Sequence, residues 1–230
     1  MPTYVMSDLH GCYDKYMAML EKIGFSDEDT LYILGDICDR GEDGIKILQD
    51  MMTRPNVIPL LGNHDWTFYA VLQRLKKPMT GEEGGVLQSL YADWLAYNGG
   101  TPTVRAYLAL SPEERKKIED YLGEFRIYEE VTAGGKQFFL SHAGIGNFEP
   151  DKPPEDYDIA DFVETRIDYD RVYFPDRYLV TGHTPTGLIH PAYAGKILMR
   201  NRHIAIDCGA VFGYPLGCLC LDTLEEFYTD

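Results

Sequence analysis

Short apolar runs alternate with segments of helical spacing over the first 77 residues. Three runs predict buried strands: TYVMS (3–7), TLYILG (30–35) and NVIPLLG (56–62). Each run precedes a segment in which apolar residues recur three or four positions apart, which predicts helices over 12–24, 43–52 and 64–77. This β-α-β-α-β order predicts parallel strands covered by helices, as in an α/β fold.

The pattern loosens in the middle of the chain. Helical spacing over 86–97, together with SPEERKKIEDYL (111–122), predicts a helical elaboration across residues 78–125. The second of these helices has a strong start signal, because Ser111 stands at its N-cap and Glu114 at its capping-box position.

After residue 125 the signals are mainly strands: RIYEEVT, KQFFLSH, RYLVTGH, HIAIDCG and GCLCLDT, joined by Gly/Pro turns. The sequence shows no repeat, no low-complexity linker and no composition shift of the kind that marks a domain boundary. We therefore expect residues 1–230 to form a single catalytic domain.

Five of the predicted strands end in a short glycine-containing turn that carries Asp, Asn or His. The turns are SDLHG (7–11), GDICDRG (35–41), GNHD (62–65), SHAG (141–144) and TGHT (181–184). The carboxyl ends of strands line the ligand crevice in open α/β sheets, so these turns are expected to converge on one site.

The polar residues of the turns have the chemistry of a site for two metal ions. The candidate ligands are Asp8, His10, Asp36, Asn63, His142 and His183. Asp8 and His10 are two positions apart, so in extended geometry their side chains lean toward the same ion. Asp36 has two carboxylate oxygens and could bridge both ions. A mixture of oxygen and imidazole ligands suits Mn, Fe or Zn.

The remaining charged residues of the turns suggest phosphoryl transfer to water. Two metal ions can clamp a phosphoryl group and lower the pKa of a bridging water for in-line attack. His64 could protonate the leaving alkoxide with Asp39 orienting its ring, and Arg40 supplies a planar donor fork for phosphate oxygens. Each motif alone could be a charged turn or a structural histidine, but their joint occurrence favours a site. His190 and His203 fall outside such turns and are interpreted as structural.

The composition of the chain limits the kinds of partner and the compartment that we expect. A formal net charge of −16, from 37 acidic against 21 basic residues, disfavours generic nucleic-acid binding. No apolar run is long enough for a membrane span, and no signal peptide is visible. The five cysteines are odd in number and contain no CxxC pair, so we expect reduced thiols in a cytoplasmic protein. A monomer is the default expectation for the oligomeric state.

The five turns, in this order, resemble the signature blocks of the PPP-type phosphoprotein phosphatases of the calcineurin-like metallophosphoesterase superfamily. The resemblance is greatest to the short prokaryotic and phage members, for which the bacteriophage lambda protein phosphatase is the model. It implies a four-layer αββα sandwich with a dinuclear centre, most often Mn²⁺, with Fe, Zn or Mg as alternatives. By match, Asp8, His10 and Asp36 hold one ion. Asp36, Asn63, His142 and His183 hold the other.

The resemblance also implies roles for the charged residues beside the metals. His64 matches the family's acid, Asp39 its orienting carboxylate and Arg40 its first phosphate-binding arginine. A second arginine matches Arg166 in DFVETRIDYD, although the aromatic residue usual before it is replaced here by Glu164-Thr165.

The implied function is a metal-dependent serine/threonine protein phosphatase that acts on a phosphorylated protein or peptide through a metal-bound water. One alternative is a symmetrical dinucleoside polyphosphate hydrolase, which would split diadenosine tetraphosphate. Those relatives resemble the N-terminal half but typically lack the aspartate corresponding to Asp39, so the presence of Asp39 favours the protein phosphatase. A non-catalytic binding protein of the same fold is a third interpretation, disfavoured by the full ligand set.

Overall fold

The computed structural model describes residues 1–78 and 80–229. Its first sheet has five strands in the order β10 (Glu226–Tyr228), β9 (Gly217–Cys220), β1 (Thr3–Met6), β2 (Thr30–Ile33) and β3 (Val57–Pro59). Strands β1, β2 and β3 are parallel, with Thr3 opposite Thr30 and Leu31 opposite Val57. The helices that follow them are α1 (Tyr13–Lys22), α2 (Gly44–Met51) and α3 (Asn63–Leu75). The predicted β-α-β-α-β unit is confirmed.

The second sheet also has five strands, in the order β4 (Tyr128–Ala133), β5 (Lys136–Ser141), β6 (Tyr178–Thr181), β8 (His203–Ala205) and β7 (Leu198–Arg200). Its three inner strands are parallel, and β4 and β7 pair antiparallel at the edges. The predicted strands of the second half correspond to β4, β5, β6, β8 and β9. Sequence analysis missed β7 and β10, which have only three residues each.

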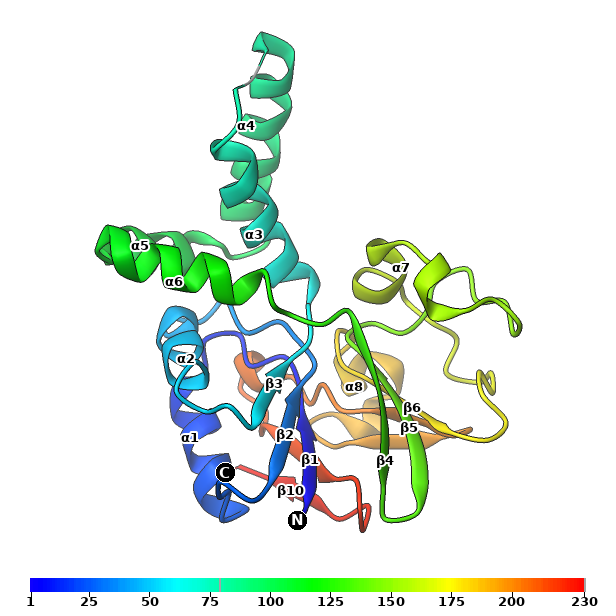
Figure 1. Ribbon diagram of the computed structural model, residues 1–230. Coiled ribbons are helices and arrows are strands. Elements are labelled where there is room, and N and C mark those ends of the chain that lie inside the picture. The colour runs from blue at the N-terminus through cyan, green and yellow to red at the C-terminus, as the bar shows by residue number, and fades with distance from the viewer. Residues whose placement is uncertain (79, 230) are drawn as a thin grey trace.

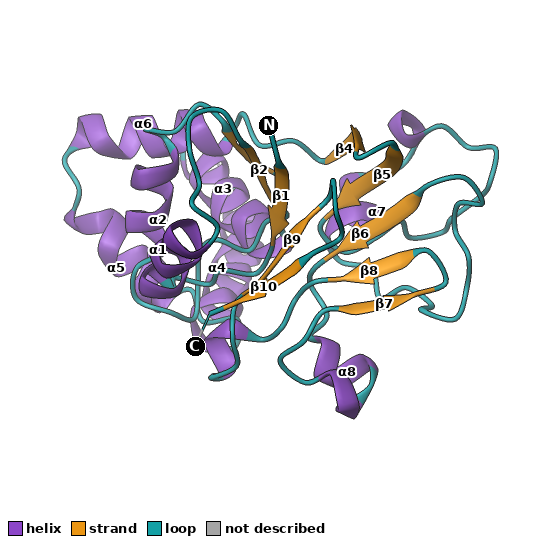
Figure 2. Cartoon of the chain, turned by 90° about the horizontal axis from the view of Figure 1, so that it is seen from below, coloured by secondary structure: helices purple, strands orange, loops and turns teal. Residues whose placement is uncertain are grey.

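The two sheets pack face to face, and helices cover their outer faces (Figures 1 and 2). Alternation along the strands produces this layering, because successive side chains point to opposite faces. Val5 and Leu34 share a buried cluster with Phe138 of the second sheet, whereas Met6 belongs to the cluster that contains the helices. On the outer face of the second sheet, Phe139 stacks on Phe162 of α7 (Ile159–Val163). This is the expected αββα architecture.

Residues 78–125 are largely helical in the part that the structure describes. The helices are α4 (Gly81–Ala96), α5 (Thr101–Ala109) and α6 (Pro112–Leu122). The capping box of α6 is present as predicted, with the Ser111 hydroxyl accepting from the Glu114 amide at 3.3 Å. Helix α4 begins five residues before the expected start because Thr80 and Glu83 form a second capping box. Helix α5 was not predicted.

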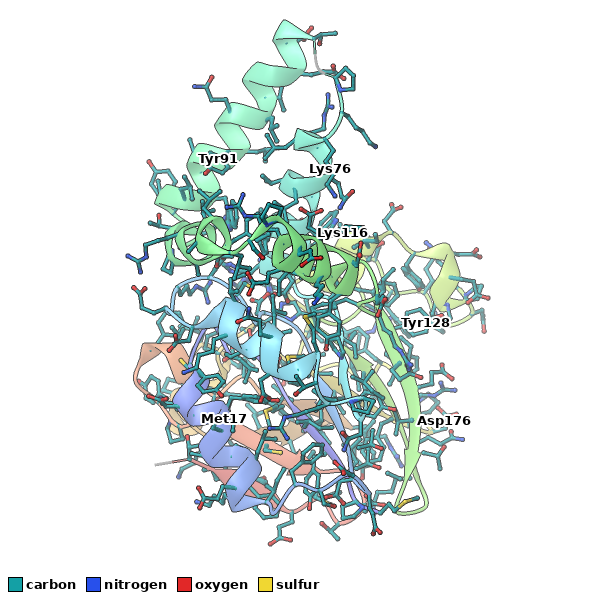
Figure 3. The ribbon with its side chains drawn as sticks, turned by 60° about the vertical axis from the view of Figure 1, so that its left-hand side comes forward. Met17, Lys76, Tyr91, Lys116, Tyr128 and Asp176 are labelled. Carbon is teal, nitrogen blue, oxygen red and sulfur yellow. The ribbon has the colours of Figure 1, made fainter. Side chains whose placement is uncertain are left out.

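Helices α3 and α4 project together from the body of the molecule (Figure 1). Tyr91 marks the projecting α4 in Figure 3, and Lys116 marks α6, which lies between α4 and the sheets. All five cysteines are free. Over residues 1–78 and 80–229, no helix combines the length and apolar character needed to cross a bilayer.

Candidate metal centre

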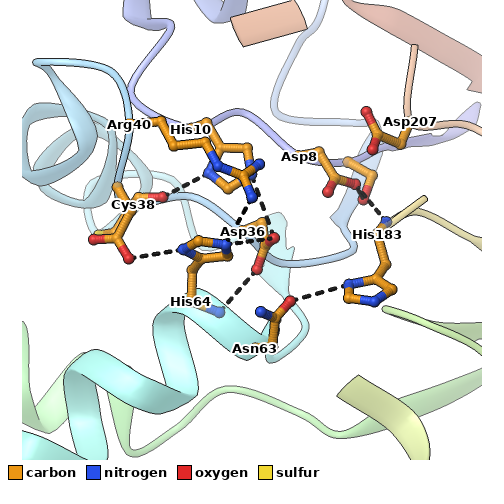
Figure 4. Close-up of polar contacts among 12 residues, drawn as sticks. Asp8, His10, Asp36, Cys38, Arg40, Asn63, His64, His183 and Asp207 are labelled. Carbon is orange, nitrogen blue, oxygen red and sulfur yellow. Dashed lines mark hydrogen bonds and ion pairs between the residues drawn. The ribbon is translucent and has the colours of Figure 1, made fainter. Parts of the chain in front are cut away.

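The five polar turns follow β1, β2, β3, β5 and β6, and contacts between the two sheets bring them together. His142, after β5 in the second sheet, donates its Nδ1 proton to the Leu34 carbonyl of the first sheet at 2.6 Å. The backbone amide of His183, after β6, donates to the Asp8 carboxylate at 2.9 Å. Figure 4 shows the resulting cluster, in which turns from both sheets face a common centre.

Backbone strain is concentrated in this cluster. Among the residues that the structure describes, ten non-glycine residues have positive φ. Six of the ten are candidate site residues: Asp8, His10, Asp36, Asp39, Arg40 and His183. A left-handed conformation costs an L-residue roughly 1–2 kcal/mol, and such strain is typical of functional sites. These strained turns place their polar side chains together in one small volume.

Asp36 lies between two groups of potential metal donors. Its Oδ2 is 3.4 Å from His10 Nε2, and its Oδ1 is 3.5 Å from His142 Nε2. The first donor group consists of His10, Asp36 and His64, and the second of Asp36, His142 and His183. Within each group the potential ligand atoms all lie within 4.8 Å of one another. Each Asp36 oxygen therefore faces a different group, which is the geometry of a bridging carboxylate.

The histidine hydrogen bonds fix which ring nitrogen faces the centre. His10 Nδ1 lies 2.9 Å from the Cys38 carbonyl, just as His142 Nδ1 contacts the Leu34 carbonyl. A carbonyl oxygen only accepts hydrogen bonds, so both Nδ1 atoms carry a proton, and in the neutral ring the lone pair is then on Nε2. Metal-binding histidines commonly anchor their other nitrogen in this way.

The second group gives the clearest test of whether a cation fits. His142 Nε2 and His183 Nδ1 each lie 3.1 Å from the same oxygen, Asn63 Oδ1. The Nε2 lone pair of His142 thus faces an amide oxygen that also bears lone pairs. A divalent cation satisfies both atoms at once, so the donors present fit a metal ion.

Asp8 is the remaining predicted ligand, and its sharing of an ion with His10 stays a prediction. It belongs to neither donor group, and its Oδ2 accepts from the Ser7 hydroxyl at 2.5 Å as well as from the His183 amide. It nevertheless lies within electrostatic reach of Asp36. Asp8 therefore adds negative charge beside the centre and ties the first turn to the last.

Burial and neighbouring charges shift the pKa values of the residues in the cluster. Burial opposes ionisation of Asp36, but His142 and His64 outweigh it and hold the Asp36 pKa well below its usual range. The pKa of Asp8 is raised by burial, and the Asp36 charge acts in the same direction. Burial and the neighbouring His142 lower the pKa of His183 to about 3, so His183 is neutral and able to act as a ligand.

Two buried acids of the site were missed by sequence analysis. Asp65 accepts from the amides of Ile37 and Cys38 at 3.1 and 3.2 Å, which holds the GDIC turn in place. Burial and the Asp36 charge raise the pKa of Asp65 to about 7. Asp207 lies beside Asp8 in Figure 4, and burial, followed by the Asp8 charge, raises the Asp207 pKa well above normal. Both acids follow strand-like runs close to a glycine, a signal shared with the turns that were recognised.

The proposed acid and its orienting carboxylate are in contact. His64 Nδ1 donates to Asp39 Oδ2 at 2.8 Å, and Asp39 is fully buried. Burial opposes protonation of His64, but Asp36 and Asp39 outweigh it, and the net effect raises the His64 pKa. Arg40 donates from Nη2 to His64 Nε2 at 3.1 Å and from Nη1 to His10 Nε2 at 2.5 Å. The guanidinium therefore spans the first donor group.

Arg166 lies beside the second donor group, where its Nη1 donates to the Thr184 hydroxyl at 3.2 Å and its charge acts on the neighbouring His183. The two histidines interpreted as structural lie outside both groups. His190 accepts from the Ala192 amide, and His203 is buried and stacks on Tyr169 with 4.7 Å between ring centroids.

Comparison with known proteins relates this geometry to a family. The model of the family described as calcineurin-like phosphoesterase matches residues 1–202. A symmetrical bis(5'-nucleosyl)-tetraphosphatase of Buchnera aphidicola subsp. Acyrthosiphon pisum is 41% identical over 78 residues, or 33% of this chain and 28% of that protein. The same enzyme of an Acidovorax species is 30% identical over 147 residues, or 63% of this chain and 44% of that protein. The chain thus spans less than half the length of the curated relatives it matches.

Among solved structures, a chain assigned as a diadenosine tetraphosphatase superposes with a TM-score of 0.68 at 16% identity. The alignment covers 99% of this chain and 92% of that one, so the fold is shared throughout. Because the family model covers most of the chain, this protein belongs to the calcineurin-like phosphoesterase family.

Proposed function

We propose that the protein hydrolyses symmetrical dinucleoside tetraphosphates, such as diadenosine tetraphosphate, to two nucleoside diphosphates. The observation that carries this proposal is the 41% identity to a symmetrical bis(5'-nucleosyl)-tetraphosphatase over 78 residues. The comparisons therefore favour the alternative from sequence analysis over the main interpretation, a serine/threonine protein phosphatase.

The family uses divalent metal ions, and we propose Mn²⁺ for this chain. We assign Asp8, His10 and Asp36 to one ion and Asp36, Asn63, His142 and His183 to the other. Bound cations would supply Lewis-acid stabilisation of the phosphoryl group and activation of the attacking water. The two donor groups that share Asp36 support His10, His142 and His183, and the Asn63 oxygen lies beside the second group. Asp8 lies outside both groups and is assigned from its match to the family's first motif.

The chain's own charged residues bind and orient the substrate. The two terminal nitrogens of the Arg40 guanidinium point toward the first donor group. A phosphoryl group bound there would accept a hydrogen bond from each of them. Arg166 would hold phosphate oxygens beside the second group. His64, whose pKa is raised, would deliver a proton from Nε2 to the leaving oxygen while Nδ1 stays bonded to Asp39. Nε2 can carry that proton once the Arg40 nitrogen that contacts it turns to a bound phosphate.

One observation favours the protein phosphatase as a second candidate. The contact between His64 and Asp39 orients the imidazole and favours its protonated form, as a general acid requires. A seryl or threonyl alkoxide is a strong base and needs a proton to leave, whereas a nucleoside diphosphate leaves as a stable anion. An oriented acid is therefore more valuable for a phosphomonoester than for a dinucleotide.

The two candidates are distinguished by one assay on metal-stripped protein re-supplied with Mn²⁺. We would compare kcat/KM on diadenosine tetraphosphate with that on a phosphoserine/phosphothreonine peptide, and separate the nucleotide products by chromatography. The proposal expects a preference for the dinucleotide and ADP as the sole product. A preference for the peptide would replace it with the second candidate, and ATP plus AMP would exclude symmetrical cleavage.

A further inference from the structure

Asp39 is held by side chains from α4 and α5 of the helical segment α4–α6, far from it in the sequence. The Trp94 indole lies near the end of α4, is 1% exposed, and donates from Nε1 to Asp39 Oδ2 at 2.6 Å. An indole nitrogen can only donate, and a buried one needs an acceptor. Trp94 thus donates to the same carboxylate oxygen that accepts the hydrogen bond from His64 Nδ1.

The other oxygen of Asp39 is held from the start of α5. The buried Thr103 hydroxyl donates to Asp39 Oδ1 at 2.6 Å and accepts from the Asp39 backbone amide at 2.8 Å. Both carboxylate oxygens and the amide of Asp39 are thus fixed, although this residue has a φ of +70°. Without these contacts the carboxylate could rotate away from the imidazole.

The loop between α4 and α5 is seated against the same turn. The Gly99 carbonyl accepts from the Arg40 amide at 2.8 Å. A Cβ at Gly99, where φ is +79°, would lie 2.9 Å from Arg40 Cγ, and one at Gly100 would collide with the Trp94 ring. Glycines at both positions allow the backbone to touch the Asp39–Arg40 turn directly.

We propose that Trp94 and Thr103 are positioning residues, which orient the Asp39 carboxylate so that it holds His64 for proton donation. The segment 94–103 thereby positions the Asp39–His64 pair, although none of its own groups takes part in the reaction. This inference rests on the acid role of His64 proposed above, but not on the identity of the natural substrate.

The test compares two probe substrates that differ in their need for an acid. Phenyl phosphate releases a phenolate of pKa about 10, like that of tyrosine, whereas p-nitrophenyl phosphate releases a much weaker base. Trp94→Phe keeps an aromatic ring against Phe68 but removes the donor. We expect kcat for phenyl phosphate to fall about 10-fold and kcat for p-nitrophenyl phosphate less than about 3-fold, with KM unchanged.

Thr103→Val should show the same selective loss of phenyl phosphate turnover. Thr103→Ser, which restores the hydroxyl, should recover the wild-type ratio of kcat for phenyl phosphate to kcat for p-nitrophenyl phosphate. In an Asp39→Asn background, Trp94→Phe should add little further loss, because the partner that it positions is already changed. Tyr107→Phe is the matched control. It removes a hydroxyl bonded to Glu119 within the same helical segment, and its ring also packs on Phe68.

A spectroscopic measurement keeps the test independent of activity. In Zn²⁺-loaded protein with ¹⁵N-labelled histidine, the Nδ1 proton of His64 should shift in Trp94→Phe and Thr103→Val but not in Tyr107→Phe. If all variants lower both probe activities equally and leave this proton unmoved, the two residues are merely structural and the inference is overturned. If the proton shifts while His64→Ala leaves the probe ratio unchanged, the positioning is real and the acid role is the part that fails.

Discussion

The strand-end turns and the helical segment α4–α6 both act on the His64 imidazole, in different ways. The turns supply the polar groups themselves, on backbone that is strained at Asp36, Asp39 and Arg40. The helical segment supplies Trp94 and Thr103, which contact Asp39 behind the imidazole and not the imidazole itself. Residues proposed to bind metal or substrate thus lie in the turns, whereas residues that hold another side chain in place lie in the helices, and the two kinds should respond differently to substitution.

The largest effect is expected from the turn residue shared by both donor groups. Asp36→Asn removes the negative charge that both groups share and replaces one of its two oxygens by an NH2 group, so both metal sites should weaken. We expect kcat to fall about 10⁴-fold or more, because two-metal catalysis depends on both ions. Metal content by plasma mass spectrometry is the accompanying measurement. Full occupancy with normal turnover would exclude Asp36 as the bridge.

The next effect concerns the proton donor rather than the metals. His64→Ala removes the imidazole that Asp39 orients, and we expect turnover of a phosphoserine peptide or phenyl phosphate to fall about 10²–10⁴-fold. Metal content should remain close to that of the wild type, which distinguishes this variant from Asp36→Asn. Loss of metal from His64→Ala would instead assign His64 to the first donor group as a ligand, since its ring nitrogen lies within that group.

The sequence predicted the polar turns because each turn is local. Asp8 and His10, or Asp39 and Arg40, are neighbours in the chain, and an apolar run before a glycine places them at a strand end. Trp94 and Thr103 lie 55 and 64 positions from Asp39, so no spacing rule links them to it. They became apparent only when the structure brought α4 and α5 against the second turn.

The same reasoning explains which elements of the fold were missed. Helix α5 begins with Thr-Pro-Thr-Val after two glycines, a composition with weak helix propensity, and it forms because Thr103 and Tyr107 are buried. Strands β7 and β10 exist only as partners of β8 and β9. In each case tertiary contacts supply a stabilisation that a single segment does not reveal.

Burial alone does not distinguish a candidate ligand from a supporting histidine. Burial lowers the pKa of His203 to about 3, as burial and His142 do for His183. His183, however, faces Asn63, whereas His203 contacts the Thr181 hydroxyl and the Tyr169 ring. The residues around each ring, and not its pKa, separate the two roles.

This contrast predicts a pH dependence of stability for the supporting histidine. Because the folded-state pKa of His203 lies below its unfolded value of about 6.5, the unfolded state takes up a proton first as pH falls. The wild type should lose about 2 kcal/mol relative to His203→Gln between pH 7 and pH 5. Urea unfolding of both proteins at the two pH values measures the difference. Equal losses in both would show that His203 is not a buried neutral group.

The smallest effect is expected at a helix cap that does not touch Asp39. Ser111→Ala removes the hydroxyl that accepts from the Glu114 amide at the start of α6, and should cost about 1 kcal/mol in the free energy of unfolding. Its ratio of phenyl phosphate to p-nitrophenyl phosphate turnover should equal that of the wild type, unlike the ratio in Trp94→Phe. A changed ratio would mean that the helical segment supports His64 as one cooperative body, in which case the assignment to two individual contacts would be too narrow.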